Sequence, residues 1–330
     1  MKQNIESESN NITQPYWPTL KLMLSSLIVF NFYLNLSDKN KVSFLISIFD
    51  LTLIPMFVFI VAFVTKNTTW KSLRVSLLSS LIIYVTFQTI DAIPLYFSGE
   101  LSLKTYLLEP QNGVWFFLAT PIWQAFFLLL SPKLKSNSFA LFCILVVSLI
   151  SAYLASNYLM KLSSFFSIIL YFPFFIIAYF INDENIASLR KNSYFTILII
   201  TALAIAALYY ENDINRLVIT MTNIDSPSSF FIIYILKFFI SMALGSSIIY
   251  FALSTDKYAK VSNNALGVYL IHPIICFIFL QVFAYFHVEY SLLIIILLTL
   301  STISIALLLA FSPTIHWFIE PKLNFNKLTQ

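Results

Sequence analysis

Long apolar runs separated by short polar segments are the feature that most restricts how this chain folds. A helix needs about 20 apolar residues to cross the hydrocarbon core of a bilayer, and runs of that order recur along the whole chain. They lie at 19–36, 43–64, 74–96, 114–131, 138–157, 163–181, 193–210, 229–253, 263–286 and 291–312. The sequence therefore predicts an all-α polytopic membrane protein with about ten transmembrane helices.

The overall composition agrees with this class and excludes others. Hydrophobic residues make up 59% of the chain and charged residues 10%, against about 25% charged residues in soluble domains. Only 4 glycines are present, no nucleotide-binding motif is visible, and no nucleic-acid partner is expected. Cys143 and Cys276 both lie inside apolar runs, which favours buried small hydrophobes over a disulfide or a metal site.

The distribution of basic residues predicts the orientation. With the N-terminus inside, five basic residues fall in outer loops, namely Lys39, Lys41, Lys104, Lys161 and Arg216. Twelve fall in cytoplasmic segments, namely Lys2, Lys66, Lys71, Arg74, Lys133, Lys135, Arg190, Lys191, Lys257, Lys260, Lys322 and Lys327. This excess satisfies the positive-inside rule. It predicts a multi-pass plasma-membrane protein with both termini in the cytoplasm.

The chain divides into a membrane domain and two polar tails. Residues 1–15 are polar and lack the apolar core of a signal peptide, so we expect a disordered cytoplasmic tail there. Residues 16–320 form the expected ten-helix membrane domain, and residues 321–330 form a second cytoplasmic tail.

Four stretches in order carry a resemblance to a known family. They are "IPMFVFIVAF" (54–63), "PQNGVWFFLATPIWQ" (110–124), "LYFPFFIIAYF" (170–180) and "LGVYLIHP" (266–273). Together they resemble membrane acyltransferase family 3, which includes fucose 4-O-acetylase-like and surface-glycan O-acetyltransferases. The resemblance implies transfer of an acyl group from cytosolic acyl-CoA to a hydroxyl of an envelope glycan or lipid-linked sugar. Acyl-CoA is then a substrate, and no bound cofactor is expected.

The first apolar run departs from the family at its catalytic position. In this run the family carries a basic residue and, eleven residues later, a histidine that is preceded by a glycine. Lys21 stands at the basic place, whereas Asn31 and Phe32 stand where Gly and His are expected. A second family histidine falls on Leu53. Because phenylalanine has no titratable group, Phe32 cannot act as a general base.

Two other residues are candidates for the missing base. His272, in "YLIHP", matches a histidine that many family members keep and is predicted near the middle of its helix. The alternative for His272 is a neutral imidazole that donates to a carbonyl of a neighbouring helix. Asp50 lies in the outer half of the second run. An ionisable residue at such a depth is a functional-site hypothesis by default.

Lys71 and Arg74 are the candidates for binding the donor phosphates. They stand three residues apart in "WKSLRVS" and so share one helical face. They match the family's basic pair on the predicted cytoplasmic side, where coenzyme A is found. The alternative is that they serve only the positive-inside topology.

Asp50 and Lys237 are predicted at similar depths in their helices. A single charge in hydrocarbon costs roughly 2.5–3.5 kcal/mol on insertion scales and usually has a partner. We therefore expect an ion pair between them that fixes the bundle. The alternative is that Lys237 reaches along its helix to the outer interface.

Asn31, Gln88 and Asp91 are expected near the outer end of the bundle, where they could bind sugar hydroxyls on the acceptor side. The alternative, favoured for Asp91, is a solvated helix end.

Two functions compete at this point. One is a membrane O-acyltransferase with an altered base, which the Lys71 and Arg74 pair favours. The other is a catalytically inactive relative that assists assembly or export of a polysaccharide or lipid-linked sugar, which the loss of the histidine favours. A secondary transporter ranks last, because broken helices in two corresponding halves are not visible.

Overall fold

The computed structural model describes residues 15–37, 39–222, 227–288 and 290–322. Across these ranges the regular elements are helices, and no strand is present. The predicted all-α class is confirmed. Each predicted apolar run coincides with at least one helix, because apolar runs of that length satisfy their backbone polar groups internally only as helices in lipid.

Within the described residues, seven helices are long and apolar enough to cross a membrane, by length and composition. They are α2 (Trp17–Leu34), α3 (Lys39–Thr65), α4 (Trp70–Phe97), α8 (Ser138–Leu154, continued by a π-helical turn at Ala155–Leu159), α14 (Pro227–Phe251), α16 (Ala265–Tyr285) and α17 (Leu292–Ala310). The protein is therefore a polytopic membrane protein.

Two bent pairs of helices raise the number of candidate spans to as many as nine. The first pair runs through Ser164–Phe180, which contains η2 (Ser164–Phe166), α9 (Ser167–Leu170) and α10 (Phe172–Phe180), and bends by 87° into α11 (Asp183–Lys191). The second joins α12 (Tyr194–Tyr209) to α13 (Glu211–Thr222) with a bend of 71°. These bends place polar helices at the ends of apolar ones.

The fourth apolar run forms a shorter helix than expected. It gives α6 (Trp115–Leu129), which has 15 residues. At 1.5 Å per residue such a helix is roughly 22 Å long, less than the ~30 Å hydrocarbon core. By length and composition, the described part of the chain thus contains seven to nine candidate spans, with α6 as a shorter apolar helix beside them.

Four short helices lie outside the predicted apolar runs. They are α5 (Leu103–Leu108), α7 (Pro132–Ser136), α15 (Ala259–Ser262) and α18 (Pro313–Ile319). Side-chain capping explains two of them, because Ser102 and Ser131 accept hydrogen bonds from backbone N–H groups in the first turns of α5 and α7. Asn182 and Asn185 form a capping box that likewise begins α11.

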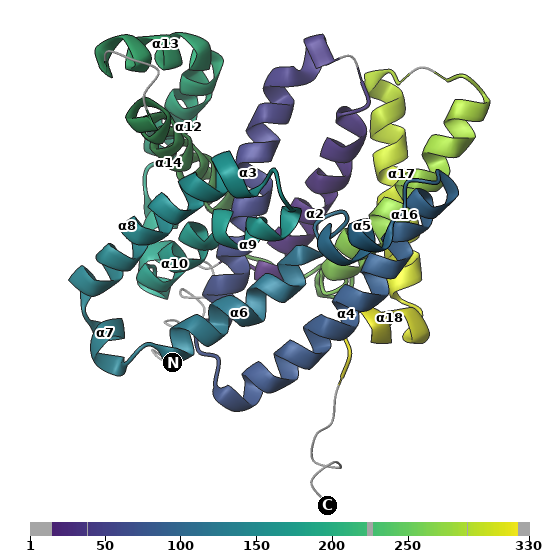
Figure 1. Ribbon diagram of the computed structural model, residues 1–330, viewed down its shortest axis with the longest axis horizontal. Coiled ribbons are helices and arrows are strands. Elements are labelled where there is room, and N and C mark those ends of the chain that lie inside the picture. The colour runs from purple at the N-terminus through teal and green to yellow at the C-terminus, as the bar shows by residue number, and fades with distance from the viewer. Residues whose placement is uncertain (1–14, 38, 223–226, 289, 323–330) are drawn as a thin grey trace, which may run out of the picture.

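Helices α2 and α3 lie between two groups of helices (Figure 1). Helix α2 packs on α3, α16 and α17, whereas α3 also packs on α10 and α14. Leu24 of α2 belongs to a core with Phe57 and Phe175, while Val29, further along α2, belongs to a second core with Val268. The candidate site residues of α2 and α3 therefore lie where the two cores meet.

Helices α16 and α17 approach closely at a glycine. A Cβ atom on Gly267 would lie 2.5 Å from the Cβ of Ala310. Small residues allow such close backbone approach between membrane helices. This contact holds α16, and with it His272, firmly in the bundle.

Candidate functional site

Asp50 of α3 and Asn31 of α2 are joined directly. Asn31 Nδ2 donates a hydrogen bond of 3.0 Å to Asp50 Oδ1. Asn31 immediately precedes Phe32, the residue at the expected base position. The structure therefore joins the Asp50 carboxylate of α3 to the residue of α2 that precedes Phe32 in the chain.

Asp50 lines a cavity of about 180 Å³ between α3, the segment of α9 and α10, and α14. The polar part of the wall consists of Asp50, Ser156, Tyr171, Tyr234, Lys237 and Ser241. At roughly 30 Å³ for each water-sized group, the cavity holds about six such groups, which suits one sugar ring. Hydroxyl, carboxylate and ammonium groups are the partners that sugar hydroxyls bind.

Two buried polar atoms at this site lack partners among the described residues. They are the Oγ of Ser241, which lines the cavity, and the Oδ1 of Asn31. Buried polar groups are normally hydrogen-bonded, and an exception calls for an explanation. A polar ligand in the cavity would supply the missing hydrogen-bond partner of the Ser241 hydroxyl.

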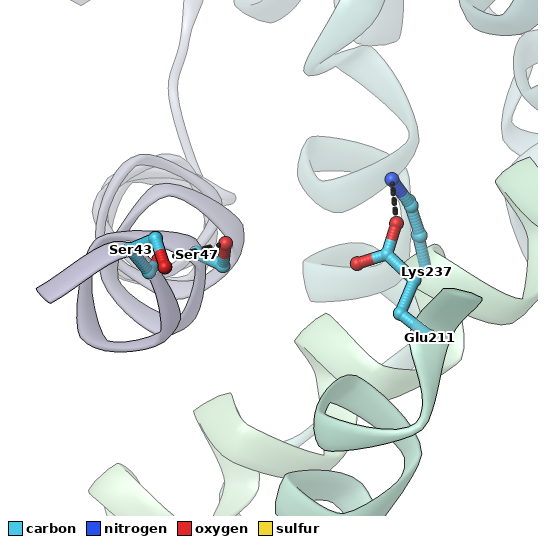
Figure 2. Close-up of polar contacts among 4 residues, drawn as sticks. All are labelled: Ser43, Ser47, Glu211 and Lys237. Atoms are coloured by element: carbon cyan, nitrogen blue, oxygen red, sulfur yellow. Dashed lines mark hydrogen bonds and ion pairs between the residues drawn. The ribbon is translucent and has the colours of Figure 1, made fainter. Parts of the chain in front are cut away.

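The predicted ion pair between Asp50 and Lys237 is wrong. Lys237 Nζ lies 2.8 Å from Glu211 Oε1 at the start of α13. Figure 2 shows these two side chains pointing toward each other, apart from Ser43 and Ser47 of α3. The bend after Tyr209 places the Glu211 carboxylate within reach of this lysine.

His272 lies in a different environment. It is 3% exposed, and its Nδ1 lies 2.7 Å from the backbone oxygen of Tyr269. Since a carbonyl only accepts, Nδ1 carries the proton in this contact. The ring of Phe32 meets the imidazole edge-on, with centroids 6.2 Å apart. His272 is thus enclosed by protein and is absent from the wall of the Asp50 cavity.

Gln88 has a structural role, which differs from both the sugar binding and the solvated helix end considered from the sequence. Its Nε2 donates to the backbone oxygens of Tyr106 (2.8 Å) and Glu109 (3.1 Å), and its Oε1 accepts from the backbone N–H of Gln111 (2.9 Å). These hydrogen bonds hold the segment that leads into α6, and acceptor binding by Gln88 stays a prediction.

Asp91 is also inside the protein rather than at a solvated helix end. It is 4% exposed, with Asn112 beside its carboxylate. The expectation of a wet helix end is wrong for Asp91. Neither Asp91 nor Gln88 lines the Asp50 cavity, so of the three predicted acceptor-side residues only Asn31 contacts this site.

The cationic candidates lie elsewhere. Lys71 and Arg74 are both exposed in the first turns of α4. A capping box formed by Thr69 and Ser72 begins this helix. Lys21, half-buried on α2, interacts electrostatically with Glu320 beyond α18. Among the described residues, no three His, Cys, Asp or Glu side chains gather in a way that could hold a metal ion.

Comparisons of the chain with models of protein families, with curated proteins and with solved structures found no match. Fold and site together define the class of the protein as an all-helical membrane protein with a polar cavity beside Asp50.

Proposed function

We propose that this protein is a plasma-membrane O-acyltransferase of membrane acyltransferase family 3, with ten spans and both termini in the cytoplasm. Its donor is acyl-CoA and its acceptor is a hydroxyl of an envelope glycan. The hydrogen bond between Asn31 and Asp50 carries the proposal, because it orients a carboxylate on the wall of a polar cavity.

In this proposal Asp50 is the general base. The acceptor hydroxyl gives its proton to the Asp50 carboxylate while its oxygen bonds to the acyl carbon. The carbon–sulfur bond of the thioester then breaks, and the coenzyme A thiolate takes up the proton. A positioned base contributes about 10²–10⁴-fold to the rate. Asn31 orients the carboxylate through its 3.0 Å hydrogen bond.

The same cavity offers donors for the developing oxyanion. The hydroxyl groups of Tyr171 and Tyr234 line it together with Asp50. Donors aimed at developing negative charge in a water-poor site stabilise the transition state. Lys71 and Arg74 bind the phosphates of the donor from the cytoplasm, by charge-assisted hydrogen bonds.

A second candidate is a catalytically inactive relative that assists assembly or export of a polysaccharide or lipid-linked sugar. The packing of Phe32 against His272 favours it, because this contact leaves the family's histidine positions without an accessible imidazole.

NMR of envelope glycans separates the two candidates. O-acyl signals are compared with the gene deleted, restored, and restored with Lys71→Ala and Arg74→Ala together. The proposal predicts that the signals vanish on deletion, return on restoration and fall with the double variant. Lys257→Ala with Lys260→Ala, an exposed pair at the same spacing, is the control and should keep them. Acyl content that never changes would exclude the enzyme.

A further inference from the structure

A second cavity lies beside the one that Asp50 lines. It has a volume of about 330 Å³ and runs between α12, α13 and α14. Most of its wall is hydrocarbon, for example Leu203, Ala207, Phe239 and Ala243, whereas its polar residues are Glu211, Asn215 and Lys237. An apolar groove with a polar group of residues suits an amphiphile rather than a sugar alone.

Lys237 belongs to both cavities. Its Nζ pairs with Glu211, and both side chains are partly exposed, at 40% and 32%. An ammonium group therefore stands where the apolar groove and the sugar-sized cavity meet.

The polar residues of the groove lie beside interfacial aromatics. Tyr209 and Tyr210, which directly precede Glu211, are 70% and 55% exposed. Exposed tyrosines gather at the level of lipid headgroups. Helix α13 turns by 71° from α12 and begins with Glu211 and Asp213, as expected of a polar helix at the interface. Lys237 thus reaches the depth at which lipid phosphates lie.

We propose that this groove binds a single-chain lipid phosphate. The hydrocarbon chain lies along α12 and α14, and the phosphate binds Lys237 in place of the Glu211 carboxylate. The group beyond the phosphate extends toward Asp50. At roughly 30 Å³ for a water-sized group, 330 Å³ holds about ten chain groups, the rest of the chain lying in the bilayer. This inference rests on the proposed function in one respect, since it makes the acceptor a lipid-linked sugar.

The chemistry selects a phosphate over a neutral head. Glu211 already occupies the position of an anion 2.8 Å from the ammonium. A phosphate offers more acceptor oxygens than a carboxylate does, and charge-assisted contacts of this kind are strong. The Lys237 ammonium then keeps an anionic partner whether or not the lipid is bound.

Binding of three probes to the full chain in nanodiscs tests the site: dodecyl phosphate, dodecanol and inorganic phosphate. Native mass spectrometry measures the affinities. We expect dodecyl phosphate to bind at least about tenfold more tightly than dodecanol, as one charge-assisted contact allows, and inorganic phosphate not to bind detectably. Lys237→Gln should remove that advantage, whereas Lys161→Gln, at an exposed lysine elsewhere, should keep it. Glu211→Gln should tighten dodecyl phosphate binding.

A second pair of variants tests the groove itself. Ala207→Phe places a ring in the cavity and should weaken both dodecyl probes, whereas Ala202→Phe, on an exposed position of the same helix, should leave them unchanged. Equal binding of dodecanol and dodecyl phosphate, or an unchanged affinity in Lys237→Gln, would overturn the phosphate site. These binding measurements involve no acyl transfer. The lipid-phosphate site and the proposed enzyme activity can therefore fail independently of each other.

Discussion

Asp50 and His272 are both ionisable residues within apolar segments, but they differ in what surrounds them. Asp50 is exposed to a cavity and holds one hydrogen bond to Asn31. His272 is almost completely buried, and its donor nitrogen is used by the carbonyl of Tyr269 in its own helix. The first residue has acceptor capacity left for a ligand, whereas the second is packed by its neighbours.

This difference teaches that depth in the membrane does not by itself identify a catalytic residue. An intramembrane polar group is a functional candidate by default, and both residues meet that criterion in the sequence. Their packing separates them, because Phe32 covers one side of His272 while Asp50 faces Tyr171 and Tyr234 across open space.

The largest expected effect on stability is at His272. His272→Ala removes a buried ring and its hydrogen bond, so we expect a loss of about 2–4 kcal/mol in the free energy of unfolding. Asp50→Ala should change it by less than about 0.5 kcal/mol, since exposed substitutions are usually small. Thermal unfolding in detergent measures both. The reverse order would contradict the assignment of the two regions.

A smaller effect is expected at the contact between α16 and α17. Gly267→Leu forces the helices apart at Ala310, and overpacking of this kind costs about 1–3 kcal/mol. Gly267→Ala should cost less than Gly267→Leu in the same unfolding assay. Equal stability of wild type and Gly267→Leu would show that α16 is not held there.

The smallest effect concerns a buried hydrogen bond between α2 and α17. The Tyr33 hydroxyl and Thr302 Oγ1 lie 2.8 Å apart, both fully buried. Tyr33→Phe and Thr302→Val should each cost about 1 kcal/mol. The double variant should cost less than the two together, because the residues share one interaction. Additive losses would mean that the bond does not contribute.

The sequence predicted the helices of this fold because apolar runs of membrane length have few other solutions. It did not predict α5, α7 and α18, because side-chain caps and an N-terminal proline, rather than apolar periodicity, begin these helices. It also missed the shortness of α6, which ends at Leu129 because Leu130 and Ser131 are extended ahead of Pro132.

The sequence identified individual residues of the candidate site, but it did not predict which of them contact one another. Asp50, Asn31 and Lys237 are each unusual in an apolar segment, so composition singles them out. The partner of Lys237 depends on the bend between α12 and α13, which lies outside any local pattern. Glu211 was therefore missed, although its place next to Tyr210 at the end of an apolar run was a usable signal.

The most direct test of the central claim is the O-acyl content of envelope glycans, measured by NMR in cells that carry Asp50→Asn. This substitution keeps the shape of the side chain but removes the base, so we expect transfer to fall by about 10²–10⁴-fold. Adding Phe32→His should restore part of it, because an imidazole at position 32 would supply a titratable base where phenylalanine has none. Wild-type acyl content in Asp50→Asn would contradict the account.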